Sequence, residues 1–171
     1  SSSEECPAYN RPMLTKSIVA GLSADQIAIV DPSWYEENKV FQMLGKKVAS
    51  VDVNEKEVIL ESGEKVHFTR LIYALGSECF IPPIEGSSLP EVVAIRRLVD
   101  VEKLEKMMEH AAKAVVIGGG VLGLEAAWAL KKAGIDVQVL EAAPILMGRQ
   151  LDENASDIVR SFAERRGVKT S

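Results

Sequence analysis

A glycine-rich segment between two apolar stretches constrains the fold of this chain more than any other feature. Residues 114–117 form a short apolar run, which is typical of a buried parallel strand. Residues 122–133 then predict a helix, and a second strand over 136–140 ends at Glu141, about 20 positions beyond the glycines. Between the first strand and the helix, three glycines have the spacing G-x-G-x-x-G: Gly118, Gly120 and Gly123. This order of elements predicts a βαβ unit that binds a dinucleotide.

Each of these residue types has a physical role in such a site. The three glycines allow, in order, a sharp turn off the strand, close approach of the backbone to a pyrophosphate, and tight packing of the helix on the strand. The phosphates then lie at the helix N-terminus, where unpaired N–H groups and the helix dipole attract anions. We expect Glu141 to accept hydrogen bonds from the adenosine ribose and to repel a 2′-phosphate, which favours NADH over NADPH. The alternative is a glycine-rich turn that binds no nucleotide, with Glu141 simply solvated at a strand end.

Composition limits the remaining classes of function. The chain has 171 residues, 47% of them hydrophobic, and a formal net charge of −5, which fits one or two globular domains and argues against a nucleic-acid partner. No apolar run approaches the roughly 20 residues of a membrane span. The cysteines, Cys6 and Cys79, are far apart, so we expect free thiols and a cytoplasmic protein. His67 and His110 have no neighbours at metal-ligand spacing, so we expect no metal site.

Hydrophobic periodicity predicts most of the other elements. Alternating apolar and polar residues over 49–53, 58–60 and 66–68 predict a three-stranded antiparallel meander. The continuous apolar run 71–75 predicts a strand buried on both faces. Short strands are also expected at 40–43, 91–95 and near Val168, and helices at 12–20, 98–112 and 152–166, the last with Ile158, Val159 and Phe162 as its apolar stripe.

Four stretches together resemble one known family. They are Pro7-Ala-Tyr-Asn-Arg-Pro-Met-Leu-Thr-Lys16, the meander leading into Ala74-Leu-Gly-Ser77, the glycine segment, and Leu146-Met-Gly-Arg-Gln-Leu-Asp152. They resemble the FAD-dependent pyridine nucleotide-disulfide oxidoreductases, and among these the NADH:rubredoxin reductases, NADH-dependent nitrite reductase large subunits and ferredoxin reductases.

The resemblance implies an α/β fold that combines a partial Rossmann-type nicotinamide-binding βαβ unit with a three-stranded antiparallel β-meander from the FAD domain. Residues 1–87 would then be a partial FAD-binding domain without its first βαβ unit. Residues 88–171 would be a partial NAD-binding domain without its later strands. We therefore expect the chain to be a central excerpt of a longer enzyme that is inactive alone.

The resemblance also assigns cofactor contacts. Arg11 and Lys16 match the family's Arg-Pro-x-Leu-Ser-Lys motif, whose cations face the flavin, with Thr15 in place of the usual Ser. Ala74 and Gly76 match the turn where FAD meets the crossover between domains; Leu75 stands there in place of the family's Thr. Glu125 matches a glutamate that lies near Lys16 and the flavin ring.

The implied reaction is hydride transfer from NADH to flavin N5, followed by electron transfer to an acceptor such as rubredoxin, nitrite or a ferredoxin. Lys16 would favour the negative charge of reduced flavin, and Glu125 would hold Lys16 in place. Two alternatives stay open. One is a thiol-dependent NADH oxidase or disulfide reductase that uses Cys6, and the other is a catalytically silent nucleotide-binding module. Exposed edges of an incomplete sheet would also favour a homodimer.

Overall fold

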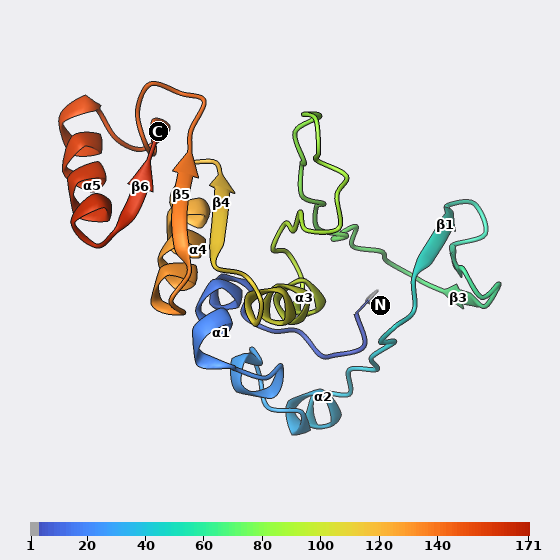
Figure 1. Cartoon of the computed structure of the whole chain (residues 1–171). Helices are drawn as coiled ribbons and strands as arrows, with labels where there is room; N and C mark the ends of the chain where they lie inside the picture. Colours follow the sequence, from blue (N-terminus) through green and yellow to red (C-terminus); the bar gives the residue numbers. More distant parts are fainter. Residues whose placement is uncertain (1–3) are drawn as a thin grey trace. The chain divides into compact units, whose positions relative to one another are not determined.

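The computed structural model describes residues 4–171, which form two compact units (Figure 1). Unit 1 contains Ala24–Glu78 together with the segment that ends at Asn10. Unit 2 contains Arg11–Ser23 and Cys79–Ser171. The expected cofactor domains, 1–87 and 88–171, stay a prediction, and residues 1–3 of the first lie outside the described part of the chain.

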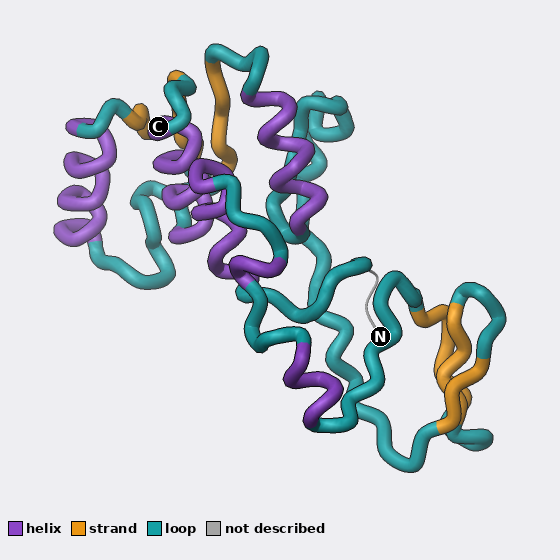
Figure 2. Tube along the Cα trace, turned by 90° about the horizontal axis from the view of Figure 1, so that it is seen from below, coloured by secondary structure: helices purple, strands orange, loops and turns teal. Residues whose placement is uncertain are grey.

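Unit 1 contains the predicted meander (Figure 2). Its strands are β1 (Val48–Asp52), β2 (Glu57–Leu60) and β3 (Lys65–His67), and they pair antiparallel in the order β1-β2-β3. Val58 pairs with Val51 on one side and with Val66 on the other. The alternating pattern of the sequence therefore located all three strands to within one or two residues.

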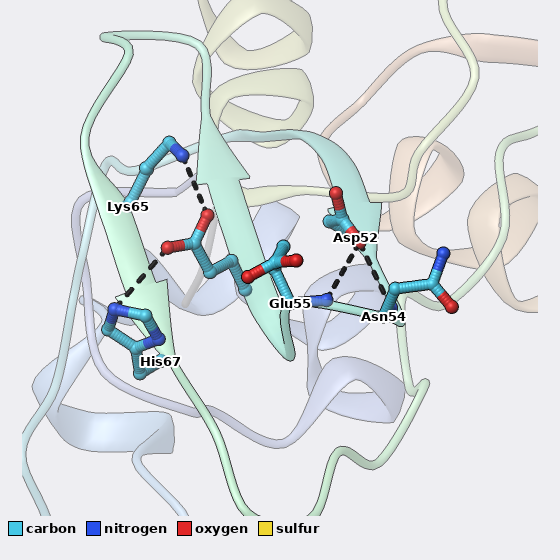
Figure 3. A network of polar contacts seen from close by, with 6 residues as sticks. Asp52, Asn54, Glu55, Lys65 and His67 are labelled. Atoms are coloured by element: carbon cyan, nitrogen blue, oxygen red, sulfur yellow. Dashed lines mark hydrogen bonds and ion pairs between the residues drawn. The ribbon is translucent and has the colours of Figure 1, made fainter.

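Polar contacts gather at one end of this meander, where β1 ends, β2 begins and β3 ends (Figure 3). The Glu57 carboxylate accepts a hydrogen bond from Lys65 Nζ at 2.8 Å and lies 3.3 Å from His67 Nε2. The hydrogen bond that Lys65 donates to Glu57 raises the pKa of Lys65. At the β1–β2 turn, Asp52 Oδ1 accepts the backbone N–H groups of Asn54 and Glu55, each at 3.0 Å. Such local side-chain bonds are typical of tight turns.

The rest of unit 1 is mostly irregular. It includes a 3₁₀ helix, η2 (Asp25–Ile27), the short helix α2 (Ser33–Glu37) and a bridge between Tyr9 and Ala28. The expected strands at 40–43 and 71–75 are wrong. Ile72 and Tyr73 are 87% and 77% exposed, and no strand among residues 4–171 pairs with this run. A strand buried on both faces requires neighbouring strands for its backbone groups, and here it has none.

Unit 2 contains the predicted βαβ unit and a third strand. The elements are β4 (Lys113–Ile117), α4 (Val121–Lys132), β5 (Asp136–Leu140), α5 (Glu153–Arg165) and β6 (Val168–Thr170). The strands are parallel in the order β4-β5-β6, as the arrows in Figure 1 show. The prediction of a strand beginning near Val168 is confirmed.

One face of this sheet forms the core of unit 2. Val137 and Val139 are fully buried there, and helices α3 (Leu98–Met108), α4 and α5 supply side chains such as Leu104, Leu130 and Ala163. Alternation along β4 leaves its remaining apolar residues, Val115 and Ile117, more than half exposed. Thus β4 is covered on one face only.

The remaining helices and the 91–95 segment of unit 2 agree only in part with the sequence expectations. A 3₁₀ turn, η1 (Arg11–Met13), leads into α1 (Leu14–Ala20), which ends at Gly21 in the left-handed conformation, as expected. The expected strand at 91–95 is wrong, because this segment is irregular. The expected stripe on α5 is wrong for two of its three residues, because the helix turns Ser156 and Ala163 inward and leaves Ile158 and Phe162 exposed, whereas Val159 is half-buried. None of the helices within residues 4–171 is both long and apolar enough to cross a membrane.

Candidate functional site

The glycine segment makes the turn from β4 into α4. Gly118 has a φ of 111°, which a residue with a side chain rarely adopts, and its N–H donates to Leu140 O at 2.8 Å. A Cβ added at Gly123 would lie 1.9 Å from Gly118 O. The first turn of α4 therefore packs directly on the turn that precedes it, and both positions require glycine.

The N-terminus of α4 is uncapped. Its N-cap is Gly120, and no side chain among the described residues accepts a hydrogen bond from the first turn of the helix. A Cβ added at either Gly118 or Gly120 would meet no atom within 4 Å, so the space in front of the turn is open. Val121 and Leu122, in the first turn, are 43% and 67% exposed. Unpaired N–H groups at an accessible helix N-terminus can bind a phosphate.

Glu141 lies beside this turn, at the end of β5. Its Oε2 accepts a hydrogen bond from Gly119 N at 2.6 Å, and its Oε1 accepts one from Ala143 N at 2.8 Å. These bonds stabilise the charged carboxylate, so the backbone N–H groups of Ala143 and Gly119 lower the pKa of Glu141 although partial burial opposes them. Each oxygen retains a lone pair, so two hydroxyl groups can still donate to Glu141.

Gly119 joins the glycine turn to the segment after β5. Besides its bond to Glu141, its carbonyl accepts the N–H of Met147 at 2.9 Å. Leu146, only 1% exposed, packs against the same residue. Sequence reasoning missed Gly119 because it occupies a variable position of G-x-G-x-x-G. The signal was present, since a third consecutive glycine is more than the motif requires.

The contact between α1 and α4 differs from the expected one between Lys16 and Glu125. Thr15 Oγ1 donates to Glu125 Oε2 at 3.1 Å, whereas no ion pair joins Lys16 to Glu125 in the described part of the chain. Successive residues of a helix point about 100° apart, so the buried Thr15 faces α4 while Lys16 is exposed. Glu125 therefore contacts α1 as predicted, but its partner is Thr15 and not the predicted Lys16.

The other predicted contacts lie in separate places. Arg11, an exposed residue of unit 2, donates from Nη1 to Arg96 O at 2.7 Å. Ala74 and Gly76 belong to unit 1, where Gly76 has a φ of 73°. Ala74 lines an apolar hollow of about 360 Å³ between the meander and the 71–75 segment. The cofactor roles of all these residues stay predictions.

The chain matches the model of a known family over residues 2–171. It belongs to the pyridine nucleotide-disulphide oxidoreductase family. Among curated proteins, it is 38% identical over 165 residues to a nitrite reductase [NAD(P)H] of Bacillus subtilis, covering 96% of this chain and 20% of that protein. It is 35% identical over 168 residues to a rubredoxin-NAD(+) reductase of Pseudomonas putida, covering 98% of this chain and 44% of that protein.

Solved structures of this family's reductases have the same fold. The chain superposes with a TM-score of 0.90 on a ferredoxin reductase from Rhodopseudomonas palustris, at 25% identity, covering 99% of this chain and 42% of that one. On the NADH:rubredoxin oxidoreductase of Clostridium acetobutylicum it superposes with a TM-score of 0.85, at 30% identity, covering 98% of this chain and 44% of that one.

These matches confirm the predicted family, the α/β fold class and the oxidoreductase class. They also confirm the predicted cofactors, FAD and NADH, at the level of the family. The chain spans less than half the length of the relatives that it matches.

Proposed function

We propose that this chain forms the central part of an NADH-dependent flavoprotein oxidoreductase, with the nicotinamide nucleotide bound at the β4–α4 turn. The observation that carries the proposal is the pairing of an uncapped helix N-terminus at Gly120 with a fixed carboxylate at Glu141. The first feature suits a diphosphate and the second suits a ribose diol, so together they fit one dinucleotide.

The nucleotide should be NADH rather than NADPH. Glu141 is held by two backbone N–H groups, so its negative charge stays beside the turn. A 2′-phosphate would meet this charge, whereas a free diol would donate to it. The names of relatives that include NADH or NAD(+) support this choice.

FAD, when bound, supplies the redox chemistry by accepting a hydride. The residues of unit 2 that we propose on its side are Arg11, Lys16 and Glu125. The exposed ammonium group of Lys16 would stabilise negative charge on the reduced cofactor. Glu125, held at α1 by the Thr15 hydroxyl, would limit where that ammonium group can lie.

The electron acceptor is proposed from the relatives, whose names include nitrite, rubredoxin and ferredoxin reductases. An acceptor of this kind, either nitrite or a small redox protein, fits the family. A homodimer is also proposed, because Val115 and Ile117 leave an apolar stripe on the open face of the sheet. Light scattering that gave only monomer would contradict the dimer.

A titration with NADH tests the central proposal. Nicotinamide fluorescence is recorded as the purified chain is added, and we expect saturable binding that weakens when NADPH replaces NADH. For the longer protein that contains this sequence, we expect a flavin spectrum that bleaches when NADH is added. A flavin that NADH does not reduce would indicate a catalytically silent binding module, and no binding of NADH would contradict the proposal altogether.

A further inference from the structure

Gly119 lies in a position where no larger residue fits. A Cβ added there would lie 2.5 Å from Leu146 Cδ2 and 3.0 Å from Glu141 Cβ. Its φ is outside the left-handed region, so the requirement for glycine comes from contact and not from backbone conformation. Gly118 and Gly120 differ in this respect, because a Cβ at either one would point into open space.

Two of the contacts of Gly119 involve Glu141. The Cβ and Cγ of Glu141 lie within 3.3 Å of the position that a side chain at Gly119 would occupy, and its Oε2 accepts a hydrogen bond from Gly119 N–H at 2.6 Å. On the other side, Met147 N–H holds the Gly119 carbonyl at 2.9 Å. Without the Gly119 bond, the carboxylate would be held only by backbone N–H groups of its own segment, chiefly that of Ala143, which donates to the other oxygen. The glutamate could then rotate about its side-chain bonds.

We propose that Gly119 is a positioning residue that sets the preference for NADH over NADPH by holding Glu141. This inference rests on the proposed function, because it concerns the same nucleotide site. Discrimination against a 2′-phosphate depends on where the negative charge lies, and electrostatic repulsion falls quickly with distance in a solvated site. A displaced Glu141 would therefore still bind a diol in part but would repel the extra phosphate less.

The test is a double-mutant cycle on the ratio of the two dissociation constants. NADH and NADPH are titrated into the wild-type chain, Gly119→Ala, Glu141→Gln and the double variant. We expect Gly119→Ala to lower the preference for NADH by about tenfold. In the Glu141→Gln background, the same change should leave the ratio unaltered, because the charge that Gly119 positions is gone.

Two further variants separate positioning from folding. Gly148→Ala introduces a milder contact, 3.1 Å from Ile145 Cγ1, without touching Glu141, and should leave the ratio unchanged. Gly119→Ala combined with Leu146→Val removes the overlap with Leu146 Cδ2 but keeps the crowding against Glu141. This pair should fold and still show the lowered preference.

The outcomes distinguish this inference from the proposed function. A Gly119→Ala variant that binds both nucleotides more weakly, with the ratio unchanged, would overturn the positioning role but leave the nucleotide site intact. The same holds if the ratio falls equally in both backgrounds. If the wild-type chain binds neither nucleotide, the proposed function fails and the role of Gly119 fails with it.

Discussion

Helices α4 and α5 begin with the same backbone conformation, but only α5 has a side chain that caps its N-terminus. Both follow a strand of the same parallel sheet. Their N-cap residues have nearly the same backbone conformation, with φ and ψ of −79° and −179° at Gly120 and of −80° and 178° at Asp152. Asp152 caps α5, because its Oδ1 accepts the N–H of Ala155 at 2.9 Å, whereas Gly120 offers no side chain to α4.

This difference in capping indicates which helix N-terminus is available to bind a ligand. An aspartate at the N-cap satisfies one of the free N–H groups and carries a charge that the helix dipole favours. The backbone at Gly120 would accept the same residue. A site that binds a diphosphate requires those N–H groups to be free, so glycine at this position fits a binding role and aspartate at the other fits a structural one.

The largest expected effect tests whether the α4 start depends on close packing. Gly123→Ala places a Cβ where the Gly118 carbonyl lies, and neither backbone group can move without shifting the helix. We expect a loss of about 3 kcal/mol in the free energy of unfolding and no measurable binding of NADH. Urea unfolding and an NADH titration check this, with Lys132→Ala on the same helix as a control. Wild-type binding by the alanine variant would contradict the packing argument.

The second prediction converts the start of α4 into that of α5. Gly120→Asp should cap the helix and keep or slightly raise stability, since a Cβ there meets no atom within 4 Å. The new carboxylate would compete for the same N–H groups and repel the diphosphate, so NADH affinity should fall at least about tenfold. Gly120→Asn provides the control, because it caps without charge and should weaken binding less. An unchanged affinity for NADH in the aspartate variant would place the nucleotide elsewhere.

A comparison of two apolar runs explains how much of this fold the sequence could predict. Residues 114–117 and 71–75 are both short apolar runs, and both were expected to be strands. The first run forms β4, which pairs with β5, and the two strands are separated along the chain by only one helix, α4. The second has no partner strand in the described residues and stays exposed. A run of apolar residues indicates that the segment favours burial, but whether it forms a strand depends on which other strands are present to pair with it.

The site shows a similar limit. The motif predicted the turn at Gly118, Gly120 and Gly123 and the acid at Glu141, because these follow from spacing along one βαβ unit. It could not predict that Glu141 bonds Gly119, or that Thr15 rather than Lys16 meets Glu125. These contacts depend on how the 141–147 segment folds back and on the rotation of α1 about its axis, and neither follows from spacing.

The third prediction is the mirror image of the second. Asp152→Ala removes the cap of α5, so the free energy of unfolding should fall by about 1 kcal/mol while NADH affinity stays unchanged. Chemical denaturation and the NADH titration measure the two quantities. Asp152→Asn, whose side chain can still accept the Ala155 N–H, should recover most of the stability. A drop in NADH affinity would show that the two helix starts are coupled.

The smallest effect concerns the charge of Glu141. Its pKa in the folded chain lies below the ordinary value of 4.5, because the N–H groups of Ala143 and Gly119 stabilise the carboxylate. A carboxyl group with a lowered pKa contributes stability above its unfolded pKa and loses that contribution as the pH falls through the folded one. Because Glu141 is only half-buried, solvent screens its carboxylate, so we expect its share to be small and to be lost over the acid range below the ordinary value of 4.5. The measurement compares urea unfolding of the wild-type chain and Glu141→Gln across this range. The stability difference between them should shrink at low pH, and a difference that stayed constant would mean that the two backbone bonds to Glu141 do not depend on its charge.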